Sequence, residues 1–146
     1  LEMAVTTNVY NSTLRNLFRG TTAFLTDTVV ATLHDAGGKF NPEHTRWEDV
    51  AASEVSTDSY ANYPGETALG SKTVTTSSNV TMFDSATISF GTSVTIAADS
   101  MIIRDQSNDV LLFHVDFGGT QTSSSGNFQL TIHAEGIFRI GKNTFS

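Results

Sequence analysis

The sequence contains no cysteine and only two prolines among its 146 residues. A chain without thiols forms no disulfide, holds no thiolate-bound zinc or iron–sulfur cluster and has no cysteine nucleophile. The absence of cysteine suits a protein that matures in a reducing cytoplasm, and we expect it to be made in one.

Charge and long apolar runs are also scarce. Charged residues make up 16% of the chain, and 8 basic against 15 acidic residues leave a net charge of −7. Phosphate binding relies on clustered lysine and arginine, so we expect no free nucleic acid as a partner. The longest strongly apolar stretch, Val110 to Phe117, contains His114 and Asp116 and is far short of the ~20 residues of a membrane span. We therefore expect no membrane partner.

The N-terminus lacks the basic and apolar regions of a signal peptide. Leu1 and Glu2 precede Met3 and look like remnants of a cloning site, so we take Met3 as the natural start. The length predicts one domain, which we place at residues 3–146.

Hydroxyl residues are abundant, with 22 threonines and 16 serines, and there are ten phenylalanines. Threonine, valine, isoleucine and phenylalanine favour pleated strands, because branched and ring side chains pack well on a half-buried sheet. The composition predicts a mainly β protein: an antiparallel β-sandwich or flattened barrel with one short N-terminal helix.

Helical spacing occurs in one segment, Asn8 to Arg19, which we expect to form the helix. An apolar run from Ala23 to Leu33 is expected to be extended and to end at a turn that exposes His34. Short β segments bounded by turn residues follow. They are Glu54–Ser56, Lys72–Thr76, Val80–Phe83, Ala86–Phe90, Val94–Ala97, Met101–Arg104, Val110–Phe117, Asn127–Ala134 and Ile137–Ile140.

Two of these segments show a period of two: Phe113, Val115 and Phe117 alternate with His114 and Asp116 in one, and Phe128, Leu130 and Ile132 are apolar in the other. This pattern predicts strands with one face buried. We expect Val110–Phe117 and Asn127–Ala134 to form a central antiparallel hairpin. The segment between them, Gly118–Gly126, has no apolar residue and is predicted to be a mobile loop that folding does not require. The predicted core of the hairpin consists of Phe113, Val115, Phe128, Leu130 and Ile132.

The sequence offers little support for catalysis. It has no Gly-x-Ser-x-Gly motif and no phosphate-binding glycine loop. His114, Asp116 and His133 could hold zinc if the hairpin register brought them together, but a solvated sheet face is the favoured interpretation. The carboxylates Asp49, Glu54, Asp58 and Glu66 could flank a glycosidase cleft, although chance proximity explains them better. We expect no enzyme activity, no metal and no cofactor.

The order of segments nevertheless resembles that of a known group. Leu14-Arg15-Asn16-Leu17-Phe18-Arg19-Gly20 near the start, and Val115-Asp116-Phe117-Gly118, Gly126-Asn127-Phe128 and Gly136-Ile137-Phe138 near the end, carry the likeness. Together they resemble a group of small virion structural proteins of tailed bacteriophages, from Met3 to Ile140. No catalytic residues are attached to that group.

The resemblance implies a capsid decoration or cement protein on the outside of the virion, which binds the major capsid protein and stabilises the shell. The alternative is a component of the tail, neck or fibre that binds a receptor or glycan. Self-association is left open, because symmetric shells offer repeated sites. We expect the partner-binding residues in the N-terminal segment and in the long connection that follows the first strand: Tyr10, Leu14, Phe18, Trp47, Tyr60 and Tyr63. The three in the connection could instead anchor it to the core, which is the favoured interpretation.

Overall fold

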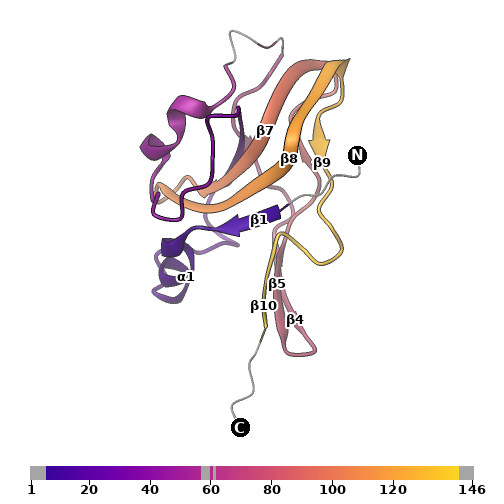
Figure 1. Cartoon of the computed structure of the whole chain (residues 1–146). Helices are drawn as coiled ribbons and strands as arrows, with labels where there is room; N and C mark the ends of the chain where they lie inside the picture. The colour runs from indigo at the N-terminus through magenta and orange to yellow at the C-terminus, as the bar shows by residue number, and fades with distance from the viewer. Residues whose placement is uncertain (1–5, 57–59, 61, 142–146) are drawn as a thin grey trace.

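The computed structural model describes residues 6–56, 60 and 62–141 of the chain (Figure 1). Mainly antiparallel strands and one α-helix near the N-terminus confirm the predicted fold class. The elements are β1 (Thr6–Val9), α1 (Asn11–Phe18), β2 (Val29–His34), the 3-10 helices η1 (Trp47–Asp49) and η2 (Ala51–Ser53), β3 (Thr67–Ala68), β4 (Thr73–Ser77), β5 (Val80–Asp84), β6 (Ile88–Ser89), β7 (Val94–Asp105), β8 (Val110–Gly126), β9 (Gln129–Leu130) and β10 (Phe138–Gly141). Within the described chain, no helix is long and apolar enough to cross a membrane.

The largest sheet has five strands in the order β1-β8-β7-β2-β3, with every neighbouring pair antiparallel. The long strands β7 and β8 form its centre, where Met101 lies opposite Val115 and Ile103 opposite Phe113. The other two sheets are small, with orders β10-β5-β4 and β6-β9. The described strands thus form open sheets and no closed barrel.

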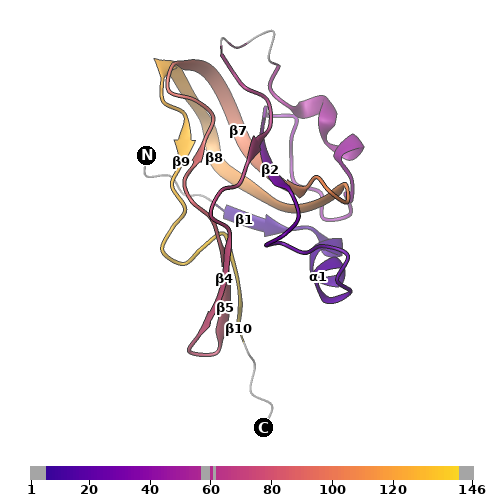
Figure 2. The same cartoon turned by 180° about the vertical axis from the view of Figure 1, so that it is seen from behind.

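The three-stranded sheet projects from the body as an arm, seen from both sides in Figures 1 and 2. Its base is held by aromatic contacts: the Phe83 ring meets Phe24 edge-on at 5.6 Å, and the Phe138 ring lies 5.4 Å from Phe113. The outer strand β4 is exposed along its whole length.

One face of the five-stranded sheet carries the main core. Phe113 and Val115 are buried there as predicted, and Phe128 packs between the rings of Phe90 and Phe117. Leu130 and Ile132, also predicted as core residues, are only partly buried. Both lie in residues 127–137, a segment that crosses this face of the sheet and has little regular secondary structure.

The opposite face of the sheet is largely covered, so the expectation of a solvated polar face on Val110–Phe117 is wrong for His114, although Asp116 is exposed. A second cluster of Tyr10, Val50, Ile102 and Leu111, with Phe40 and Trp47 packed against it, lies on this side. His114 is opposite Ile102 in the sheet and is almost completely buried. The period-two pattern correctly placed His114 on the face opposite Phe113 and Val115, but the connection between β2 and β3 shields His114 from water.

The predicted central hairpin is wrong. Strand β8 pairs with β7 and β1, and the Asn127–Ala134 segment contributes only the two residues of β9, which pair with β6. Alternation shows which side of a strand is buried, but it does not specify the strand that pairs with it.

The predicted mobile loop Gly118–Gly126 is in fact the second half of β8. It pairs with the first half of β7: Ala98 lies opposite Gln121 and Ile96 opposite Ser123. The register shifts between Ala98 and Ser100, where Gly118 adopts a φ of 74°. This bulge lets a polar strand follow the curve of its apolar partner.

The N-terminal predictions also need correction. Asn8 and Val9, expected at the start of the helix, belong to β1, and the helix begins at Asn11. The Ala23–Leu33 run is extended only from Val29, because Asp27 closes a turn by accepting the Ala23 N–H at 2.7 Å. His34 is the last residue of β2 and is fully buried, not exposed in a turn.

Candidate functional site

The structure divides the six predicted partner-binding residues into three groups. Tyr10 and Tyr63 are buried in the core, whereas Trp47 and Tyr60 are half-buried. Leu14 and Phe18 are exposed, and Phe18 presents 80% of its surface to solvent. Only the two helix residues are therefore available to a partner without rearrangement of the fold.

Tyr63 serves the core of this chain. Its hydroxyl accepts the Leu33 N–H at 3.1 Å and donates to Glu54 Oε1 at 3.2 Å. Burial raises the pKa of the Tyr63 hydroxyl above its usual value, so the phenol stays neutral. Burial likewise raises the pKa of Tyr10. Both residues hold the long connections of the chain on the sheet.

Trp47 is committed to contacts within the protein. The guanidinium of Arg104 lies 4.6 Å from the centre of its ring, and the His34 ring meets it edge-on at 5.8 Å. Arg104 also forms an ion pair of 2.7 Å with Glu66. A cation over one ring face and an imidazole at 5.8 Å leave Trp47 poorly placed to stack on a sugar.

The α1 helix has two contrasting faces. Ser12 and Thr13 are buried, whereas Leu14 and Phe18 face solvent together with Arg15 and the adjoining Arg19. Residues four apart on a helix are neighbours, so the two apolar and the two basic side chains form parallel stripes. We call these four residues, Leu14, Arg15, Phe18 and Arg19, the helix patch.

Hydrogen bonds fix this orientation of the helix. The Thr13 hydroxyl donates to the Leu112 carbonyl of β8 at 2.7 Å, and the Tyr10 N–H donates to the same carbonyl at 3.3 Å. On the other side, the Asn11 N–H donates to the Pro42 carbonyl at 3.0 Å. Thr13 thus anchors α1 to the sheet and Leu17 packs against the main core, whereas Leu14 and Phe18 are left outside.

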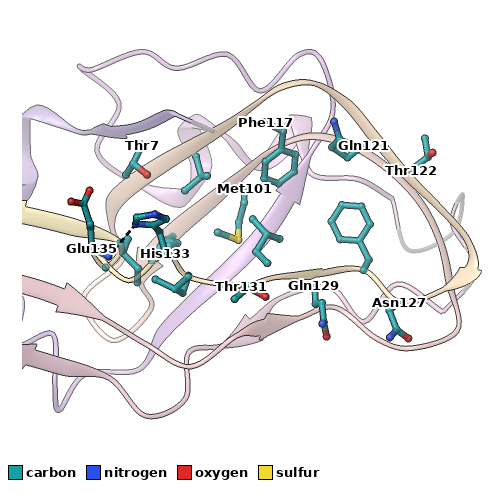
Figure 3. A pocket seen from close by; sticks show the side chains of 17 residues that line it. Thr7, Met101, Phe117, Gln121, Thr122, Asn127, Gln129, Thr131, His133 and Glu135 are labelled. Carbon is teal, nitrogen blue, oxygen red and sulfur yellow. Dashed lines mark hydrogen bonds between the residues drawn. The ribbon is translucent and has the colours of Figure 1, made fainter. Parts of the chain in front are cut away.

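The three residues considered for zinc do not come together. His114 and Asp116 lie on the sheet face toward Gly38, where the His114 Nε2–H donates to the Gly38 carbonyl at 2.7 Å. His133 lies over the opposite face of the sheet, where it lines the same hollow as Val115 and Phe117 (Figure 3). No group of three possible metal ligands occurs among the described residues.

His34, a buried histidine whose pKa is lowered, lies on the same side of the sheet as His114. Nε2 of His34 is 2.8 Å from the Thr32 hydroxyl, and Nδ1 is 2.8 Å from the Ser53 hydroxyl. Since Ser53 itself donates to the Val50 carbonyl, His34 carries its proton on Nδ1. Burial, with a smaller effect of His114, lowers the pKa of His34 to about 3. Both ring nitrogens are occupied within the core, so this group has no access to a substrate.

The four carboxylates considered for glycoside hydrolysis have structural partners or lie outside the described residues. Asp49 accepts the Thr45 and Arg46 N–H groups, which lower its pKa, and Glu54 accepts the Tyr63 hydroxyl. Burial raises the pKa of Glu54. Glu66 pairs with Arg104, and Asp58 lies outside the described residues.

A hollow of about 980 Å³ opens between the five-stranded sheet and residues 127–137 (Figure 3). The side chains at its base belong to the main core and are almost fully buried: Met101 and Ile103 of β7, and Val115 and Phe117 of β8. Polar side chains form its rim: Gln121, Asn127, Gln129, Thr131, His133 and Glu135.

Two features of these surfaces were not predicted from the sequence: the two arginines of the helix patch and the hollow. Arg15 and Arg19 follow Leu14 and Phe18 at the same four-residue spacing, and this spacing could have placed them on the same side of the predicted helix. The hollow has no such signal in the sequence, because it is formed by segments that are distant in sequence.

A scan against protein-family models, a search of curated proteins and a search of solved structures each find no match to this chain.

Proposed function

We propose that this protein is a non-enzymatic structural component of a tailed-bacteriophage virion, a capsid decoration protein that binds the major capsid protein and stabilises the shell from outside. The likeness of the sequence to small phage virion proteins from Met3 to Ile140 is the starting point. The proposal also places the protein on the capsid exterior, after synthesis in the host cytoplasm.

The observation that carries the proposal is the helix patch. A helix normally turns its apolar side chains inward, yet α1 buries Ser12 and Thr13 and exposes Leu14 and Phe18. Exposed aromatic residues flanked by arginine are typical of the centres of protein–protein interfaces. The hydrogen bonds of Thr13 hold the patch in place before a partner arrives, which reduces the entropy lost on binding.

The test uses purified protein and expanded capsids that lack it. We expect saturable co-sedimentation at a fixed ratio to the capsid subunit, and greater resistance of the decorated shell to heat. Failure to bind the shell, with detection of the protein only in isolated tails, would instead support the tail, neck or fibre alternative.

Two matched variants connect the binding to the helix patch. Phe18→Asp should raise the half-saturating concentration about tenfold or more, because a central aromatic residue is replaced by a charge. Val74→Asp places the same charge at another exposed apolar residue, on the arm, and should bind like the unaltered protein. Equal binding by both variants would show that the helix patch contributes nothing to decoration.

A further inference from the structure

We propose that the outer strand of the arm, β4, pairs with β4 of a second copy of this chain, so that the two arms join edge to edge across a two-fold axis. This inference goes beyond the decoration function and does not rest on it. It assigns a use to the arm, which lies outside the helix patch, and it is tested without any capsid.

The outer edge of β4 is free to pair. β4 is the last strand in the order β10-β5-β4, all of its residues are exposed, and none of the described residues pairs with its outer edge. Such an edge presents a row of main-chain N–H and C=O groups that can accept another strand. Figures 1 and 2 show the hairpin of β4 and β5 projecting from the body, so a second molecule can approach it.

The hairpin turn determines which main-chain groups of β4 face outward. The two residues after Ser77 have φ values of 49° and 66°, as in a type I′ turn, and Ser77 lies opposite Val80. In such a turn the Ser77 carbonyl accepts the Val80 N–H, so the main chain of Ser77 faces β5. The direction alternates along a strand, and therefore the N–H and C=O groups of Val74 and Thr76 point away from β5.

The β4 strand lacks the features by which natural edge strands prevent pairing. Those strands carry charged residues or proline, or are interrupted by a β-bulge. The sequence of β4 is Thr-Val-Thr-Thr-Ser, and its register with β5 is continuous. Threonine and valine also favour extended structure and form stabilising cross-strand pairs. Nothing in β4 itself therefore opposes the addition of a strand.

The distribution of charge favours a second copy as the partner. The chain has a net charge of −7, so two copies repel each other wherever their acidic residues approach. Residues 73–83, which form β4, the turn and most of β5, contain no charged residue, so two copies can meet there without this repulsion. A positively charged partner would find no opposite charge on this surface. The other edge strand, β10, carries Arg139, and pairing two copies of β10 would bring like charges together.

The outward groups of β4 define one symmetric register. Val74 of one copy lies opposite Thr76 of the other, and the two equivalent pairs exchange four main-chain hydrogen bonds. The two-fold axis then passes between the two Thr75 residues, whose Cα atoms are about 4.5 Å apart in such a non-hydrogen-bonded pair. Both copies use the same surface, so the association stops at a dimer.

A cysteine placed at the axis tests this register. The chain contains no cysteine, so a single added thiol can form a disulfide only between copies. Thr75→Cys should oxidise rapidly to a covalent dimer, because a Cα separation of about 4.5 Å is within the range of disulfides.

Ser77→Cys is the matched control, since it is also exposed and lies on the same face of β4. In the proposed register its two copies are four residues apart along the strands, or about 14 Å. This variant should therefore oxidise at least about tenfold more slowly than Thr75→Cys. Equal rates, or a faster reaction of Ser77→Cys, would overturn the proposed pairing.

Sedimentation velocity measures the contact without a cross-link. We expect a monomer–dimer equilibrium, and Thr75→Lys should raise its Kd at least about tenfold, because two like charges then lie opposite each other at the axis. Thr131→Lys makes the same change of charge at an exposed threonine just after β9 and should associate like the unaltered protein. An unaltered protein that stays monomeric at millimolar concentration, or a Thr75→Lys variant that dimerises normally, contradicts the proposal.

The outcomes separate this contact from decoration. Phe18→Asp alters the helix patch and leaves β4 intact, so it should dimerise like the unaltered protein while its binding to shells is weakened. Dimers that do not bind shells contradict the decoration function and leave the strand pairing standing. Shell binding is compared below the concentration at which copies pair, so Val74→Asp on β4 remains a valid control there.

Discussion

Thr13 and Phe18 lie on opposite faces of the same short helix, and the polar residue is the buried one. Thr13 is completely enclosed and donates its hydroxyl to the Leu112 carbonyl at 2.7 Å, whereas Phe18 is 80% exposed. One hydrogen bond to a central strand thus helps to determine which side chains this protein offers to a partner.

Replacing Thr13 by valine should lower the free energy of unfolding by about 1–2 kcal/mol. Valine keeps the shape of threonine but removes the buried donor to Leu112. Urea unfolding measures the loss, and Thr21→Val, at an exposed threonine just beyond the helix, is the control. Equal stabilities of the two variants would show that the hydroxyl does not anchor α1.

Phe128 and Phe18 form a matched pair for a test of the core. Phe128 is buried between Phe90 and Phe117, so Phe128→Ala should cost roughly 3–5 kcal/mol of folding free energy. Phe18→Ala should change the stability of the monomer by less than about 0.5 kcal/mol because the ring is exposed. Chemical denaturation at low protein concentration measures both. A loss below about 1 kcal/mol for Phe128→Ala would place this residue outside the core.

Gly136 is required where residues 127–137 join the arm. Its φ is +80°, and an added Cβ would lie 2.5 Å from Met82 Cγ and 2.7 Å from the Phe83 carbonyl oxygen. Gly20 has a similar φ of +73° but nothing within 4 Å of an added Cβ. Gly20→Ala should cost about 1–2 kcal/mol for the left-handed backbone alone. Gly136→Ala should cost more, because the arm must shift to relieve the clash. Thermal unfolding of the two variants makes the comparison.

The buried histidine His34 should make the protein less stable in mild acid. Its pKa is about 3 in the folded state and about 6.5 in the unfolded state, so between these values the unfolded chain binds the proton first. The free energy of unfolding should therefore fall by about 1.4 kcal/mol per pH unit as the pH is lowered from 6 to 4.5. His34→Gln should flatten this dependence and lower the stability at pH 7, where the hydrogen bonds to Thr32 and Ser53 are made. An unchanged slope in His34→Gln would assign the effect to other groups.

The sequence by itself determined the class of fold and the faces of individual strands. Threonine, valine and phenylalanine indicated a mainly β chain, and alternation identified Phe113 and Val115 as core residues, because both signals depend on neighbours within one strand. The same local signal located the helix and placed Leu14 and Phe18 on it.

Only the tertiary structure decided which elements meet. Strand β8 pairs with β7 rather than with Asn127–Ala134, and its serine-rich half is ordered by the apolar strand beside it. His114 and His133 lie over opposite faces of the sheet, because the predicted pairing of Val110–Phe117 with Asn127–Ala134 does not form. Phe18 is exposed because the Thr13 hydroxyl donates to the Leu112 carbonyl, 99 positions away in sequence, and this hydrogen bond orients the helix. Pairings over such distances depend on the free energy of the whole packed chain, which no local pattern of residues contains.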